Sequence, residues 1–316
     1  MPPLISLLIG SIADWLLDGL WARPFDWLAG VTGLDILGYP IMQRAYLAAI
    51  CIAIIGPLVG SFLVHREMAM IGDTLAHSAF AGVAIGLFVN ATFAQSVSPL
   101  VTALVVAVIA ALLVQVLIEH FGTYTDTSLA IVLTGSFALG SVIVTATDGG
   151  IAVGISAYLF GSLATVSRTN AAVLLVMTVL VGGVVAATYR PLVYVTFDTV
   201  GARAAGLSVI WYDRLLVVLT AVVVVGAMQI MGVILVAAML VIPVATASSV
   251  RGFKRSIAGA VLAGQFAAIV GATVSYLFDV SAGGAVVLVA IGLYVAVYGI
   301  EQVSTAVAGR HETKAS

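Results

Sequence analysis

Long apolar runs separated by short polar stretches make up most of the chain after the first 44 residues. A helix that crosses a bilayer needs about 20 consecutive apolar residues. Seven runs reach a comparable length: 45–64, 74–92, 97–118, 128–147, 170–188, 254–278 and 283–300. We therefore predict an all-α, polytopic integral membrane protein.

One further stretch, 215–250, contains no charged residue. It is too long for a single crossing and leaves little room for a loop between two. We divide it near Gln229–Gly232 into two helices. The prediction is then about nine transmembrane helices, within a range of eight to ten.

The distribution of Lys and Arg predicts the orientation, because cytoplasmic loops carry an excess of both. If the first span runs from outside to inside, nine of the twelve basic residues lie inside and three lie outside. The inside residues are Arg66, Arg190, Arg203, Arg214, Arg251, Lys254, Arg255, Arg310 and Lys314, and the outside residues are Arg23, Arg44 and Arg168. Dividing 215–250 is what puts Arg203 and Lys254 on the same side, which supports the division.

The composition agrees with a multi-pass protein of the cell (plasma or inner) membrane. Hydrophobic residues make up 62% of the chain, charged residues 8%, and the mean hydropathy is +1.23, whereas soluble domains carry roughly a quarter charged residues. A net charge of −2 with few Lys or Arg argues against a nucleic-acid partner. A single cysteine, Cys51, excludes an internal disulfide and a thiolate metal cluster. We expect no bound cofactor.

Three regions follow from these patterns: a leader at 1–44, a transmembrane domain at 45–303 and a cytoplasmic tail at 304–316. No Lys or Arg precedes the apolar run near the N-terminus and no clear cleavage site follows it, so it is not read as a removed signal peptide. Tryptophans and aspartates alternate in the leader: Asp14, Trp15, Asp18, Trp21, Asp26 and Trp27. This mixture is typical of a helix lying in the membrane interface.

The segment "IGDTLAHSAF" places Asp73 at the start of a predicted span and His77 within it. Ionisable side chains are costly within a bilayer, so such a pair indicates function. Residues four apart share one helix face, and an Asp oxygen with a His nitrogen suits Zn²⁺, Mn²⁺ or Fe²⁺. Two ligands are only half of a four-coordinate site, which a symmetric dimer would complete.

Two simpler interpretations of this pair stay open at the level of sequence. Asp73 could cap the start of its helix by accepting hydrogen bonds from backbone N–H groups. His77 could be a packing histidine that is hydrogen-bonded to Asp73.

The inside segment 188–213 is the longest polar stretch between spans. Within it, "DTVGARAAG" predicts a short helix that begins at Asp198 and ends at Gly206. A short helix of small residues on the cytoplasmic side suits docking of a soluble partner. The simpler alternative is an amphipathic connector.

Four segments occur in an order that resembles the membrane permeases of ATP-binding-cassette importers for zinc, manganese and iron. They are "GPLVGSFLVHREMAMIGDTLAHSAFAGVAIGL", "YLFGSLATVS", "FDTVGARAAGLSV" and "GVILVAAMLVIPVATA". The resemblance covers roughly 45–300, which is nearly all of the hydrophobic chain. Each segment is weak evidence alone, but four in order at compatible spacing are specific.

The resemblance implies a homodimeric permease, cytoplasmic ATPase subunits and an external metal-binding protein that delivers the cargo. It implicates Asp73 and His77 in metal passage, with zinc as the first expectation and manganese or iron as alternatives. It also implies that Asp198, Ala202 and Gly206 face the ATPase. The chain is then a transport subunit rather than an enzyme.

The lysines agree with a partner ATPase. The chain has only two, Lys254 and Lys314, and neither lies in a G-x-x-x-x-G-K-[ST] loop. ATP-driven transport by this chain therefore requires another subunit.

Two other functions compete with the importer. A secondary transporter could use Asp73 and His77 to relay protons, but such folds often show internal repeats with broken helices, and no convincing repeat is present. An intramembrane aspartyl protease would need a second carboxylate within the membrane, and the predicted spans contain none.

Overall fold

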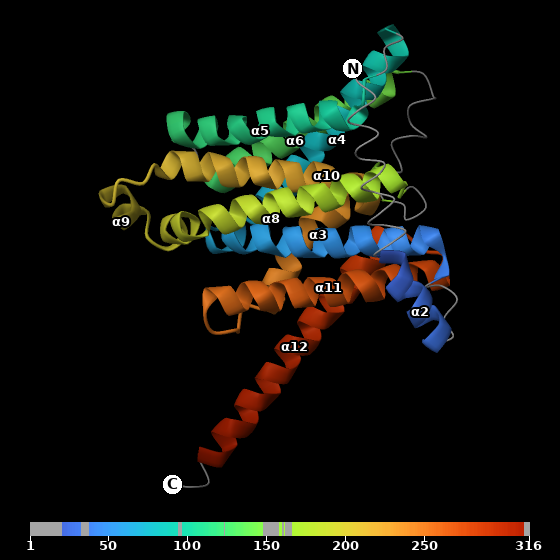
Figure 1. The fold of residues 1–316 in the computed structure, drawn as a ribbon. Helices are drawn as coiled ribbons and strands as arrows, with labels where there is room; N and C mark the ends of the chain where they lie inside the picture. Colours follow the sequence, from blue (N-terminus) through green and yellow to red (C-terminus); the bar gives the residue numbers. More distant parts are fainter. Residues whose placement is uncertain are drawn as a thin grey trace.

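The computed structural model describes residues 21–32, 38–93, 97–122, 124–147, 158–159, 161 and 166–312. All the elements longer than one turn in this part of the chain are α-helices (Figure 1). The long ones are α3 (Pro40–His65), α4 (Ile71–Phe93), α5 (Pro99–Phe121), α6 (Thr125–Ala146), α8 (Arg168–Phe197), α10 (Val209–Thr246), α11 (Phe253–Phe278) and α12 (Ala282–Glu312). The short ones are α2 (Ala22–Thr32) and α9 (Thr199–Ala204).

The long helices form a bundle in which α3, α5, α8, α10 and α11 run side by side (Figure 1). Helix α9 lies at one end of the bundle and α2 at the other, while α12 leaves it at an angle. Helices α3 and α4 are the most buried. In their most apolar stretches, 78% and 61% of the residues are buried within the bundle, against only 17% in α6. The core therefore forms around α3 and α4, and α6 presents most of its surface outward.

Helix α10 contains a reversal at Gly232, whose φ of 80° and ψ of 160° are not helical. The first part of α10 begins beside the end of α3, where Asp213 forms an ion pair with Arg66. The second part leads into α11 at the same end of the bundle, because the Phe253 ring contacts the Phe62 ring near the end of α3. Both ends of α10 thus lie on one side, so the chain must turn back between them.

This reversal confirms the division of 215–250. Eight helices are long and apolar enough to cross a membrane, and Met231–Thr246 adds a shorter apolar helix after the turn. That segment has 16 residues, so it extends about 24 Å, less than the roughly 30 Å of a bilayer core. The described chain fits the prediction of about nine helices.

Several helix bounds differ from the predicted ones, among them those of α3, α8 and α12. Helix α3 begins five residues early, with Pro40 in its first turn, where a missing N–H costs nothing. Helix α8 continues past residue 188 to Phe197 despite Pro191, because Leu192 and Val195 are fully buried and hold its last turns in place. The polar part of 188–213 shrinks to 198–208. Helix α12 continues beyond residue 303 to Glu312.

Glycines let α4 approach α5 very closely. A Cβ added at Gly82 would lie 2.6 Å from the Cα of Ala103, and one at Gly86 would lie 2.2 Å from the Thr102 hydroxyl. The two glycines are four apart, the spacing that brings membrane helices into backbone contact. This packing fixes the position of α4, which carries Asp73 and His77.

The described part of the leader packs on the start of α3. The Trp21 Nε1 donates a hydrogen bond to the Gln43 carbonyl (2.9 Å), and the Gln43 side chain donates to an Asp26 carboxylate oxygen (2.8 Å). The Phe25 ring stacks on Tyr46 with centroids 5.9 Å apart. Asp14, Trp15 and Asp18 lie outside the described residues. A position in the membrane interface stays a prediction for the leader.

Candidate functional site

Asp73 lies in the first turn of α4 and His77 one turn further on. The neighbouring Ser78 hydroxyl is 2.9 Å from that of Ser136, in the middle of α6. Gly86, further along α4, lies beside Pro99, the first residue of α5. At a rise of 1.5 Å per residue, His77 is about 13 Å and Asp73 about 20 Å from the level of Gly86. His77 therefore lies well within the membrane-spanning bundle, while Asp73 lies nearer the end of the bundle at which α4 begins.

The two side chains face each other without a good hydrogen bond. The Nε2 of His77 is 3.5 Å from a carboxylate oxygen of Asp73, beyond the usual 2.7–3.2 Å or so for N–H···O bonds. The Nδ1 of His77 is buried and has no hydrogen-bond partner within the described chain. The imidazole packs instead against the Phe137 ring in a T-shaped arrangement, with centroids 5.3 Å apart.

This geometry weakens both simple interpretations of the pair. Within the described residues, the Asp73 carboxylate lies against His77 and does not accept a hydrogen bond from a backbone N–H. Asp73 therefore does not cap the start of α4. His77 is not a satisfied packing histidine either, because one ring nitrogen is unpaired and the other is at long range. The Asp73 side chain is 38% exposed and that of His77 23%. The pair is open to a ligand from outside the chain.

Asp73 and His77 form only part of a metal site. In the described part of the chain, no three His, Cys, Asp or Glu side chains come together in a way that could hold a metal ion. Phe137, which packs on His77, is 46% exposed and lies on the outward face of α6. Further ligands would have to arrive across this open face.

The predicted cytoplasmic helix is present as α9, and Asp198 begins it. An Asp198 carboxylate oxygen accepts a hydrogen bond from the Gly201 N–H at 2.7 Å, as an N-cap does. Gly206 follows the helix with φ +81° and has open space where a Cβ would be. Asp198 and Gly206 are both exposed, as is Val200 at 78%. The α9 end of the bundle therefore presents an exposed surface formed by these three residues.

Ala202 does not face outward, and this part of the prediction is wrong. Its exposure is 0%, and it packs in a small cluster with Val195 at the end of α8 and Val209 at the start of α10. A small side chain is needed here because α9 lies directly on these two helices. Ala202 therefore holds α9 in place and is not itself part of the exposed surface.

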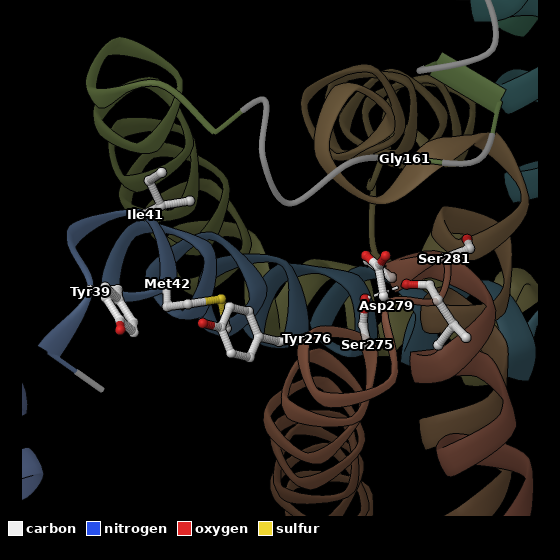
Figure 2. A pocket seen from close by; sticks show the side chains of 10 residues that line it. Tyr39, Ile41, Met42, Gly161, Ser275, Tyr276, Asp279 and Ser281 are labelled. Atoms are coloured by element: carbon white, nitrogen blue, oxygen red, sulfur yellow. Dashed lines mark hydrogen bonds between the residues drawn. The ribbon is translucent and has the colours of Figure 1, made fainter. Parts of the chain in front are cut away.

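A hollow of about 530 Å³ opens at the opposite end of the bundle. Figure 2 shows Tyr39 and Met42 on its α3 side, with Asp279 and Ser281 across from them at the junction of α11 and α12. Asp279 ends α11 in the left-handed conformation.

Two ion pairs at the α9 end of the bundle were not predicted from the sequence. Arg66 pairs with Asp213, and Arg214 pairs with Glu119 at 3.0 Å. The only signal in the sequence was that charges are rare and gather at span ends. Their partners are 147 and 95 residues away, so the pairing could not be read from spacing.

Comparison with known proteins identifies the family. The model of the family described as ABC 3 transport family matches residues 38–300. The chain belongs to the ABC 3 transport family. The resemblance found in the four sequence segments is therefore confirmed. As an ABC 3 member the chain is a multi-pass membrane permease and not itself an ATPase. The match begins at residue 38, after α2, so only the part of the leader before residue 38 lies outside the shared region.

Two curated relatives within this family cover most of the chain. The manganese transport system membrane protein MntC of Halalkalibacterium halodurans is 34% identical over 82% of this chain and 87% of its own length. A probable metal transport system membrane protein of Treponema pallidum is 30% identical over 86% and 99%.

Solved structures share the ABC 3 fold. PsaBC from Streptococcus pneumoniae in complex with Fab matches with a TM-score of 0.74 and 27% identity, over 84% of this chain and 93% of that one. A putative metal-chelate type ABC transporter in an inward-facing conformation matches with a TM-score of 0.62 at 18% identity, which supports the fold alone.

Proposed function

We propose that this chain is the permease subunit of an ATP-driven importer for a divalent transition metal, and that two copies form the path. The observation that carries the proposal is the Asp73–His77 pair, which lies on one face of α4, is partly exposed and is incompletely hydrogen-bonded. Two such pairs facing each other across a two-fold axis supply two oxygens and two nitrogens, a four-coordinate set. The open face of α6 beside Phe137 is where the second copy would approach.

Manganese is the first metal to test. Several relatives are named manganese transport or manganese import proteins, and one from Haemophilus influenzae is named a probable iron transport protein. Carboxylate and imidazole ligands accept Mn²⁺, Fe²⁺ and Zn²⁺, while the absence of a thiol disfavours Cu⁺. Zinc, the first expectation from sequence, becomes the competitor in the assay. A site with few ligands per copy also releases its ion readily, as transport requires.

Two partners follow from the two ends of the bundle. A cytoplasmic ATPase subunit would dock on the surface around α9 formed by Asp198, Val200 and Gly206. An external metal-binding protein would deliver the cation at the outer end, near the hollow that Asp279 lines. ATP-driven movement of the ATPase subunits would switch access to the paired site from outside to inside.

The test is uptake of radioactive manganese and zinc into vesicles that contain the chain, its ATPase and its binding protein. We expect Asp73→Ala and His77→Ala each to abolish ATP-dependent uptake while the ATPase still co-purifies. His120→Ala is the matched control, because His120 is exposed at the end of α5 and should leave uptake intact.

Survival of uptake in the His77→Ala vesicles would remove the pair from the path. Uptake that needs no ATP would favour the secondary transporter that uses Asp73 and His77 as a proton relay.

A further inference from the structure

Two adjacent residues at the inner end of α3 contact both ends of the segment that carries α9. His65, the last residue of α3, lies against Phe197, the last residue of α8, with ring centroids 5.6 Å apart. Arg66 forms an ion pair with Asp213, the fifth residue of α10. Phe197 and Asp213 bracket 198–212, so α3 holds the α9 segment at its entry and at its exit.

The α9 segment is packed tightly against these two attachment points. Ala202 packs between Val195 of α8 and Val209 of α10, and the Leu207 N–H donates to the Ala202 carbonyl at 3.0 Å. The Asp198 side chain caps the helix from the other end. A force on α9 is therefore delivered to Phe197 and Asp213 rather than absorbed within the segment.

A short turn joins Arg66 to α4, the helix that carries the Asp73–His77 pair. The Met68 N–H donates to the Leu63 carbonyl at 2.9 Å, and the Ile71 N–H donates to the Met68 carbonyl at 3.1 Å. These bonds close a tight turn, and α4 begins immediately after it. A Cβ at Gly72 would lie 2.7 Å from a Leu240 methyl carbon, so the first turn of α4 is tightly packed. The turn has no slack to absorb a displacement.

We propose that His65 and Arg66 are positioning residues that transmit movement of α9 to the Asp73–His77 pair. This inference rests on the proposed function. When a docked ATPase shifts α9, Phe197 and Asp213 shift with it and displace the end of α3. The tight turn then passes this displacement to α4, which moves the Asp73–His77 pair as one unit.

The Arg66–Asp213 ion pair is better placed for this role than the neighbouring Arg214–Glu119 ion pair. The Arg66 side chain is 11% exposed, and its Nη1 is buried with no hydrogen-bond partner in the described residues. Loss of Asp213 would leave that buried cation uncompensated, which destabilises the arrangement. Arg214–Glu119 is a matched pair on the next residue of α10, but Arg214 is 48% exposed and the pair reaches α5 instead of α3.

The experiment compares manganese import with ATP hydrolysis in vesicles that hold the permease, its ATPase and its binding protein. The readout is the number of manganese ions imported per ATP hydrolysed. For Asp213→Asn and for Arg66→Gln we expect this ratio to fall roughly two- to thirtyfold, with ATPase assembly and manganese binding by the purified permease unchanged. The exchanged pair, Arg66→Asp with Asp213→Arg, should recover part of the ratio, and Glu119→Gln should keep it.

A wild-type ratio in both single variants would overturn the inference, as would an equal loss in Glu119→Gln. If Asp213→Asn does not assemble, His65→Leu tests the other contact, and a wild-type ratio there also overturns the inference. Failure of the proposed function looks different, because wild-type vesicles would then show no ATP-dependent import at all.

Discussion

Replacing Gly82 by alanine tests whether the close contact between α4 and α5 positions the candidate site. The new Cβ would lie 2.6 Å from the Cα of Ala103 and 2.7 Å from the carbonyl oxygen of Thr102, whereas ordinary contact begins at 3.4 Å. Both neighbours are backbone atoms that cannot rotate away. The two helices must therefore separate by about 0.8 Å, the difference between these contact distances.

Overpacking of this kind costs about 1–3 kcal/mol, while the exchange of Gly for Ala within a helix returns roughly 0.5–1 kcal/mol. We expect Gly82→Ala to lose about 1–2 kcal/mol of stability on balance. It should also weaken manganese binding, because α4 carries Asp73 and His77. Gly183→Ala on α8 is the matched control, since nothing lies within 4 Å of its Cβ, and it should be neutral or stabilising.

The assay is thermal unfolding of the detergent-solubilised permease, with manganese binding measured on the same samples. A Gly82→Ala protein that melts at or above the temperature of Gly183→Ala would refute the reasoning, because the α4–α5 contact would then be loose enough to accept a methyl group.

Three further predictions concern the two ends of the bundle. Asp198→Ala should cost about 1 kcal/mol of α9 stability by removing the cap and weaken co-purification with the ATPase, whereas Asp198→Asn should not. Gly206→Arg should uncouple ATP hydrolysis from uptake because its bulk blocks docking; Gly206→Ala carries the same backbone strain without the bulk, so equal losses in both would point to strain instead. Trp21→Phe removes the hydrogen bond to the Gln43 carbonyl, and we expect the protease sensitivity of the leader to rise while uptake stays above half.

The spans could be predicted from sequence because apolar length is a strong physical requirement in a bilayer. The division of 215–250 was predictable for the same reason, and Gly232 supplies the backbone conformation that the turn requires. The end of α8 was not predictable, because Arg190 and Pro191 look like a helix end. Burial of Leu192 overrides that local signal.

Features of the site that depend on contacts between distant residues could not be predicted from the sequence. The spacing of Asp73 and His77 predicted a shared face, and the structure confirms it at 3.5 Å. The inward position of Ala202 could not be predicted, because a helix made of small residues shows no apolar face in its sequence. Arg66 and Asp213 were assigned to inside loops from charge alone, and only the packing of α3 against α10 reveals that they meet.

The incompleteness of the site within one chain fits the proposed transport cycle. Four ligands fixed on one rigid bundle would hold a cation tightly, and releasing it would require breaking the packing that positions them. Asp73 and His77 lie on a helix that is locked against α5 by Gly82 and against α10 by Gly72, so their own separation changes little. If the other ligands belong to a second copy, a small movement between the two copies opens the site while each half stays intact. Metal affinity would then depend on the distance between protomers, which is the quantity that an ATPase bound to both copies can change.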